Sequence, residues 1–157
     1  MSKQKPLKDF LFVIIQTVLF VAYIAPITLF TLDLPQWLKY IGLIIFCIGV
    51  FIGIIAIVQL NKNLSPFPTP VETGILLKKG AYRFSRHPIY SGILIFGFGY
   101  ALYQASTYKF LITLILSVLF YLKSLYEEQL LIEKYPDYRD YKNKIGRFLP
   151  KLKSKFF

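Results

Sequence analysis

Four long apolar stretches without a charged side chain dominate the pattern of hydrophobic and polar positions. They run from Phe10 to Leu32, Tyr40 to Leu60, Pro88 to Tyr108 and Phe110 to Leu122. A helix needs about 20 residues to cross the hydrocarbon core of a bilayer. The first three stretches reach this length. The fourth reaches it if it continues past Lys123 to Tyr126, with the lysine side chain snorkelling or pointing into a cavity.

This pattern predicts an all-α integral membrane protein with about four transmembrane helices, formed by a single membrane domain over residues 1–157. The spans are expected at about 10–32, 38–60, 88–106 and 109–126. The first stretch is too long for a cleaved signal peptide, and no small-residue cleavage site follows it. Pro26 indicates a kink and Pro35 a loop. The first two spans carry few polar side chains and are expected to form an apolar hairpin that serves as scaffold.

The positive charges predict how the helices are oriented. They gather before the first span, between the second and third, and after the fourth: Lys3, Lys5, Lys8; Lys62, Lys78, Lys79, Arg83, Arg86; Lys134, Arg139, Lys142, Lys144, Arg147, Lys151, Lys153, Lys155. The other two loops hold only Asp33, Lys39 and Lys109. By the positive-inside rule, both termini and the central loop face the cytoplasm.

Composition limits the classes of partner. The net charge of +11 accompanies 55% hydrophobic residues and a positive mean hydropathy. The basic residues follow the topology rule and no nucleic-acid motif accompanies them, so a membrane is the expected partner and nucleic acid is not. With a single histidine, no metal cluster is expected. Cys47 lies in the second span and is interpreted as a small apolar core residue.

Two polar constellations stand out against this apolar background. In "RHPIYSG", Pro88 suits the first turn of a helix, which places His87 just outside the third span and Tyr90 three residues later on the same face. Ser91, Gly92, Gly97 and Ala101 are small enough for another helix or a flat ligand to approach. An ordinary interfacial belt of Arg, His and Tyr would give the same pattern.

The second constellation is "EEQLL" at the end of the fourth span. Glu127 and Glu128 repel each other there, and a cation would relieve the repulsion. Lys123 precedes Glu127 by four residues, and an arginine of "YRFSRH" or a cationic ligand is an alternative partner; a solvated helix face is the plainest interpretation. The short linker "QASTY" requires an antiparallel hairpin, which brings His87, Tyr90 and Glu127 to the same membrane face.

The motifs "GAYRFSRHPIYSG", "EEQLL" and "YPDYRDYKNKIGRFLP" together resemble the isoprenylcysteine carboxyl methyltransferase and phospholipid methyltransferase superfamily. The similarity covers about residues 60 to 150, and "NLSPFPTP" is similar to a loop of its small prokaryotic members. The resemblance implies S-adenosylmethionine as cofactor and an amphipathic cytoplasmic cap over residues 127–150. The positive-inside rule places the site on the cytoplasmic side, and the composition, rich in lysine and isoleucine, and the compact length favour a prokaryotic cell membrane. The resemblance also implies cofactor contacts by these residues: His87, Pro88, Tyr90, Gly92, Glu127, Glu128, Tyr138 and Tyr141.

The same resemblance implies an acceptor that is lipophilic and carries a carboxylate or an amine. Lys123, Arg83 and Glu127 are the expected catalytic residues. Superfamily members often carry an arginine shortly before the Glu pair that holds the acceptor carboxylate. Here Lys123 is the only nearby cation, and Arg83 or Arg86 is the alternative. Methyl transfer requires alignment and exclusion of water, and an amine acceptor also requires a base such as Glu or His. A nicotinamide-dependent membrane reductase of related fold and a non-enzymatic membrane adaptor remain alternatives.

Overall fold

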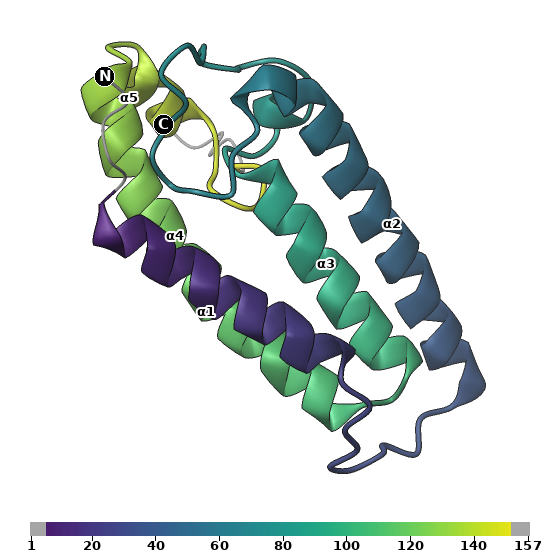
Figure 1. The fold of residues 1–157 in the computed structure, drawn as a ribbon. Helices are drawn as coiled ribbons and strands as arrows, with labels where there is room; N and C mark the ends of the chain where they lie inside the picture. Colours follow the sequence, from purple (N-terminus) through teal and green to yellow (C-terminus); the bar gives the residue numbers. More distant parts are fainter. Residues whose placement is uncertain (1–5, 152–157) are drawn as a thin grey trace.

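The computed structural model describes residues 6–151. Their regular secondary structure is entirely helical, with no strand among them, and loops join the helices. The elements are α1 (Leu7–Ile24), α2 (Gln36–Leu60), α3 (Pro88–Tyr103), α4 (Thr107–Lys134) and α5 (Tyr138–Lys144), with short 3₁₀ turns η1 (Asn61–Asn63) and η2 (Gly80–Arg83) (Figure 1). Helices α1 to α4 run side by side, and the loop from 61 to 87 gathers with α5 at one end of the bundle. The basic residues Lys3, Lys5, Lys153 and Lys155, used above to predict topology, lie outside the described residues.

The predicted all-α membrane fold is confirmed. Helices α1, α2 and α4 are long and apolar enough to cross a membrane, and α3 is a shorter apolar helix. With 16 residues, α3 extends about 24 Å at 1.5 Å per residue. The relative lengths differ from the prediction, in which the fourth span was the short one. Helix α4 continues without a break through Lys123 to Lys134, which extends it well beyond the charge-free stretch.

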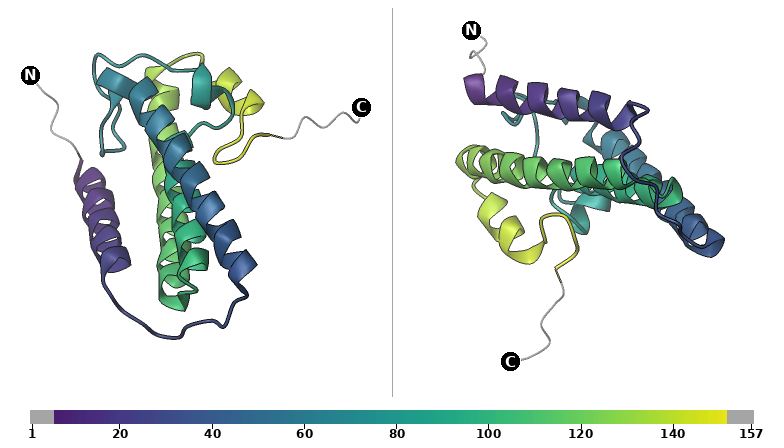
Figure 2. Two further views of the ribbon diagram at one scale, coloured as in Figure 1. Left: turned by 90° about the vertical axis from the view of Figure 1, so that its right-hand side faces the viewer. Right: turned by 90° about the horizontal axis from the view of Figure 1, so that it is seen from below.

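The first span is shorter than the 10–32 expected, because α1 ends at Ile24. Proline restricts the preceding residue to extended backbone, and Ala25, which precedes Pro26, has ψ 137°. Pro26 therefore terminates the helix instead of kinking it. Residues 25–35 form the long loop that carries the chain across the far end of the bundle to α2 (Figure 2).

Helices α2 and α3 make the closest helix pair, and glycine makes it possible. A Cβ placed on Gly49 would lie 2.2 Å from the backbone nitrogen of Phe96, and one on Gly99 would lie 2.3 Å from that of Phe46. A Cβ on Gly92 would likewise meet the backbone of Gly53 at 2.7 Å. The small residues of α3 thus serve close approach of a helix, which is one of the two uses expected for them.

Helix α1 packs on α4 instead of on α2, so the expected hairpin of the first two spans does not form. In Figure 2, α1 and α2 are separated, and α4 and α3 lie between them. Polar contacts hold the far end of α1. The Tyr23 hydroxyl donates to the Gly97 carbonyl at 2.8 Å, and Lys109 Nζ donates to the Tyr23 carbonyl at 2.7 Å.

Cys47, expected in the core, is exposed on the outside of α2. Helix α2 needs only one face to pack against α3, so most of its apolar side chains point away from the bundle. In a membrane these positions face lipid, where an apolar side chain needs no protein partner. Apolar character alone therefore does not place a residue in the core of this fold.

Candidate functional site

The start of α3 positions the first part of the site. Pro88 occupies the first helical turn and His87 is the residue that caps it. The His87 and Tyr90 rings stack with centroids 5.3 Å apart and planes 2° apart, and Tyr90 stacks in turn on Phe120 of α4 at 4.6 Å and 4°. The predicted shared face of His87 and Tyr90 is therefore present as a parallel column of rings that continues into the bundle core.

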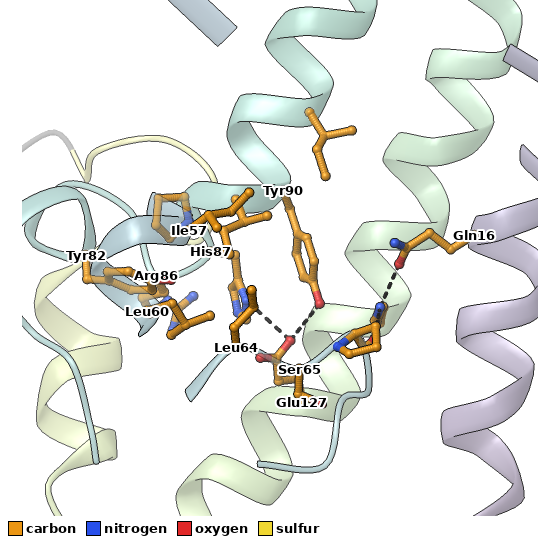
Figure 3. Close-up of a pocket in the computed structure, with 15 residues that line it drawn as sticks. Gln16, Ile57, Leu60, Leu64, Ser65, Tyr82, Arg86, His87, Tyr90 and Glu127 are labelled. Atoms are coloured by element: carbon orange, nitrogen blue, oxygen red, sulfur yellow. Dashed lines mark hydrogen bonds and ion pairs between the residues drawn. The ribbon is translucent and has the colours of Figure 1, made fainter. Parts of the chain in front are cut away.

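Glu127 meets this column from α4, as Figure 3 shows. The Tyr90 hydroxyl donates to Glu127 Oε2 at 2.9 Å, and His87 Nδ1 lies 3.6 Å from the same oxygen. The α3–α4 hairpin thus brings together His87, Tyr90 and Glu127, which the short linker led us to expect. The Glu127 side chain keeps 25% of its surface exposed, so it can still meet a ligand.

The neighbouring carboxylate, Glu128, lies in a different environment. It is 1% exposed, and four cationic or ionisable groups lie within 3.3 Å of its oxygens: Arg86 at 3.1 Å, His87 Nε2 at 3.3 Å, Lys142 at 3.1 Å and Arg147, which donates from Nε at 3.1 Å and Nη2 at 3.0 Å. Arg86 belongs to "YRFSRH", so one of the partners considered for the acidic pair is confirmed. Direct contact of Glu128 with a cofactor stays a prediction.

Three adjoining hollows lie at Glu127 and next to it. A central cavity of about 330 Å³ contains His87, Tyr90, Lys123 and Glu127 in its wall. A loop-side cavity of about 110 Å³ lies beneath the proline-rich loop and shares Tyr82, Arg86 and Glu127 with the central one. A membrane groove of about 570 Å³ runs between α1 and α2 over α3 and shares Ile57 and Ile93 with the central cavity. Ligand sites typically measure about 300–1,000 Å³.

Tyrosines of the cap wall the loop-side cavity. Tyr138 and Tyr141 of α5 line it together with Tyr82, and the Tyr141 hydroxyl donates to the Tyr82 carbonyl. Burial raises the pKa of Tyr141 to about 12 and raises the pKa values of Tyr138 and Tyr82 further. All three hydroxyls are therefore neutral at physiological pH, and that of Tyr138 has no hydrogen-bond partner among the described residues.

Several buried polar atoms on these walls have no hydrogen-bond partner among the described residues. They are Thr69 Oγ1, Arg86 Nε and the Tyr138 hydroxyl, and all three residues line the loop-side cavity. A buried polar group without a partner costs about 1–3 kcal/mol. Each of these atoms is itself buried, so a ligand in the loop-side cavity could supply the missing partner only if the wall residue turned toward it.

The remaining predicted residues are divided between the cavity and its surroundings. Lys123 is 1% exposed and lines the central cavity, where its Nζ donates to Gln16 Oε1 at 2.6 Å and to the Pro66 carbonyl at 2.8 Å. Pro88 also lines that cavity. Gly92 lines the membrane groove. Arg83 is exposed and lines none of the three hollows, whereas Arg86 lines two of them.

Two residues of the site were not singled out from the sequence. Gln16 is the polar partner that α1 offers to Lys123, and a glutamine inside an otherwise apolar span is a signal that could have marked it. Arg147 completes the surroundings of Glu128. It was noted only as one of many topology charges, although its place in "GRFLP", within the motif that carries the resemblance, was a usable signal.

Comparison with known proteins gives the family. A profile of DUF1295, described as a protein of unknown function, matches residues 1–145. The chain belongs to the DUF1295 family. No functionally curated protein matches this family member's sequence. Among solved structures, it is similar to the eukaryotic intramembrane Ras methyltransferase isoprenylcysteine carboxyl methyltransferase, with 23% identity and a TM-score of 0.68 over 92% of this chain.

The likeness establishes the fold. The chain spans about half the length of the solved methyltransferase, since the match covers 50% of that protein. This DUF1295 member therefore has the fold of a membrane methyltransferase, and the resemblance inferred from its motifs is confirmed at that level. Its membrane-spanning character is supported by the same likeness and by the length and composition of its helices.

Proposed function

We propose that the protein is an S-adenosylmethionine-dependent methyltransferase that acts at the membrane on a lipophilic acceptor. One observation carries this function: the central cavity, whose wall includes Glu127, His87 and Tyr90, adjoins both a tyrosine-lined cavity and an apolar groove between the membrane helices. Such an arrangement suits a reaction between one water-soluble and one lipid-soluble reactant. A protein that bound only one of these reactants would need only one of the two hollows.

The residues around the loop-side and central cavities fit the cofactor. Its sulfonium is a cation, and the Glu127 carboxylate with the faces of Tyr90 and His87 offers the negative charge and π surface that attract one. Arg86, with its unpartnered Nε, suits the cofactor carboxylate. Tyr82, Tyr138 and Tyr141 suit its aromatic and hydroxyl groups. When bound, S-adenosylmethionine supplies an activated methyl group with a good leaving group.

The chain's own contribution is alignment and exclusion of water. The membrane groove is lined mostly by apolar residues of α1, α2 and α3 and leads to the central cavity at Ile57 and Ile93. Lys123 lines the same central cavity, with its Nζ 5.5 Å from the Tyr90 ring centroid. An ammonium has three donors, of which two are used; the third can hold the polar group of the acceptor.

The acceptor decides whether a base is needed. A carboxylate is ionised at neutral pH and attacks directly, whereas an amine must first lose a proton. Glu127 and His87, 3.6 Å apart, are the groups that could take that proton. The loop over residues 61–87 and helix α5, which carry many of the basic residues, lie at the same end of the bundle (Figure 1). By the positive-inside rule that end would face the cytoplasm, which we take to be that of a prokaryotic cell.

Calorimetric titration of the purified protein with S-adenosylmethionine and NADPH, in two detergents and in lipid nanodiscs, tests the proposal. Saturable binding of S-adenosylmethionine alone supports it, and preferential binding of NADPH would replace it with the reductase alternative. Transfer of a radiolabelled methyl group into a lipid extract, with the product identified by mass, would then define the acceptor. If neither cofactor binds in any medium, the protein is better described as a membrane adaptor.

A further inference from the structure

The segment from Ile145 to Pro150, here called the C-terminal strap, runs alongside the start of α3. Ser85 and Gly146 form a parallel β-bridge. The backbone N–H groups of Arg86 and His87 donate to the carbonyls of Gly146 and Arg147 at 2.9 and 3.1 Å. The strap is therefore joined through the backbone to the residue whose ring lies in the wall of the central cavity.

Side chains extend this connection. The Ser91 hydroxyl donates to the Phe148 carbonyl at 2.7 Å, and the Phe148 ring packs edge-on against His87 with centroids 6.2 Å apart. His87 thus has Tyr90 on one face, Phe148 at its side and Glu127 and Glu128 at its two nitrogens. Every neighbour that fixes the ring belongs either to the α3–α4 hairpin or to the strap.

Arg147 makes the most directional contact in this arrangement. Its guanidinium donates two hydrogen bonds to Glu128, from Nε to Oε1 at 3.1 Å and from Nη2 to Oε2 at 3.0 Å. It also lies 4.9 Å from the Tyr121 ring centroid. Burial lowers the pKa of Arg147, but the hydrogen bonds and charge attraction of Glu128, together with the interactions of Tyr121, outweigh burial and leave the pKa raised. The planar fork of arginine fixes both carboxylate oxygens, which a lysine cannot do.

The orientation of the Glu128 carboxylate determines its contacts with His87 and Arg86, which line the central cavity. Its Oε1 accepts from Arg147 Nε and also meets His87 Nε2 at 3.3 Å and Arg86 Nη2 at 3.1 Å. Rotation of the carboxylate would therefore disturb two residues that line the central cavity. Lys142 contacts the other oxygen with a side chain that is 39% exposed, so it supplies charge without fixing the carboxylate plane.

We infer that Arg147 is a positioning residue: by fixing the plane of Glu128 from the strap, it sets the orientation of His87 and Arg86 toward the central cavity. It touches none of the three hollows itself. The meaning of this positioning for catalysis rests on the proposed function, whereas the positioning can be measured without it.

The composition of the chain allows a direct measurement, because His87 is its only histidine. Protein labelled with ¹³C and ¹⁵N in histidine should give one set of ring signals in nanodiscs without any cofactor. We expect Arg147→Gln to move these signals and to broaden or split them. Arg147→Lys, which keeps the charge and loses the fork, should move them by a smaller amount. Arg139→Gln, an exposed position on α5, is the matched control and should leave them unchanged.

Binding separates the inference from the proposed function. If the wild-type protein binds S-adenosylmethionine, Arg147→Gln should weaken binding about tenfold or more, since a charged hydrogen-bond pair is lost, and Arg139→Gln should not. If Arg147→Gln displaces the His87 signals but the wild-type protein binds no S-adenosylmethionine, the positioning role of Arg147 is supported and the proposed methyltransferase function is refuted. His87 signals that stay in place in both Arg147 variants would overturn the inference, as would the loss of folded protein in both, which would assign Arg147 to the fold alone.

Discussion

Replacement of Glu127 by glutamine is the sharpest test of the proposed site. The change keeps the size of the side chain and an acceptor for the Tyr90 hydroxyl, which lies 2.9 Å from Oε2. It removes the negative charge from the point where the central and loop-side cavities meet. Any loss of affinity that follows is therefore electrostatic instead of steric.

The expected magnitude follows from the position of the carboxylate. Two unit charges 4 Å apart interact by about 4 kcal/mol at an effective dielectric constant of 20. Because the Glu127 side chain is 25% exposed, solvent screens part of this. A charged hydrogen-bond partner contributes about 1.5–3 kcal/mol. We therefore expect the affinity for S-adenosylmethionine to fall about 10- to 100-fold, at about 1.4 kcal/mol for each factor of ten.

Calorimetric titration with two ligands isolates the charge. S-adenosylhomocysteine lacks the transferred methyl group, so it has a neutral thioether in place of the sulfonium, and the rest of the molecule is the same. Its affinity should change by no more than a few-fold in Glu127→Gln. Glu133→Gln, an exposed position on the same helix, should affect neither ligand. Equal losses for both ligands, or no loss for either, would show that Glu127 does not stabilise the sulfonium and that the cofactor has been placed wrongly.

Three further changes probe the acceptor side and the fold. Lys123→Ala should lower methyl transfer while leaving affinity for S-adenosylmethionine within a few-fold, because Lys123, in the wall of the central cavity, is proposed to hold the acceptor; abolished cofactor binding would show that Lys123 belongs to the cofactor side. Glu128→Gln should lower the free energy of unfolding by about 3–5 kcal/mol, and with it the thermal midpoint, because buried cations lose their partner. An unchanged midpoint would show that the ion pairs of Glu128 do not stabilise the fold. Gly49→Ala should prevent tight α2–α3 packing and lower the yield of folded protein, whereas Gly53→Ala, where nothing lies within 4 Å, should not; equal yields would contradict the close approach.

The convergence of His87, Tyr90 and Glu127 could be predicted because it depends on local rules. A proline in the first turn fixes where α3 begins, spacing of three places two side chains on one face, and a short linker forces an antiparallel return. These rules refer only to neighbours in the sequence. The structure reproduces each of them.

The different surroundings of Glu127 and Glu128 could not be predicted in the same way. Adjacent helical residues point about 100° apart, and which of the two faces a cavity depends on where α5 and the strap lie. Arg147 reaches Glu128 across a second helix and an extended segment. Likewise, the apolar pattern of the first span shows that it lies in a membrane but does not show which helix it packs against. The pairing of α1 with α4 combines apolar packing, such as Phe20 against Phe120, with a few polar contacts, such as Gln16 with Lys123.

The pairing of α1 with α4 also has a consequence for how the chain is made. Helices enter a membrane in the order of synthesis, and α1 cannot find its partner until α4, the last of the four, has arrived. Helix α2 must likewise wait for its partner, α3, which is the next helix to be made. During that interval α1 must remain stable in lipid alone, which its apolar sequence permits. The contact between Gln16 and Lys123 can form only at the end. Assembly of the central cavity is therefore a late event that requires the whole four-helix chain.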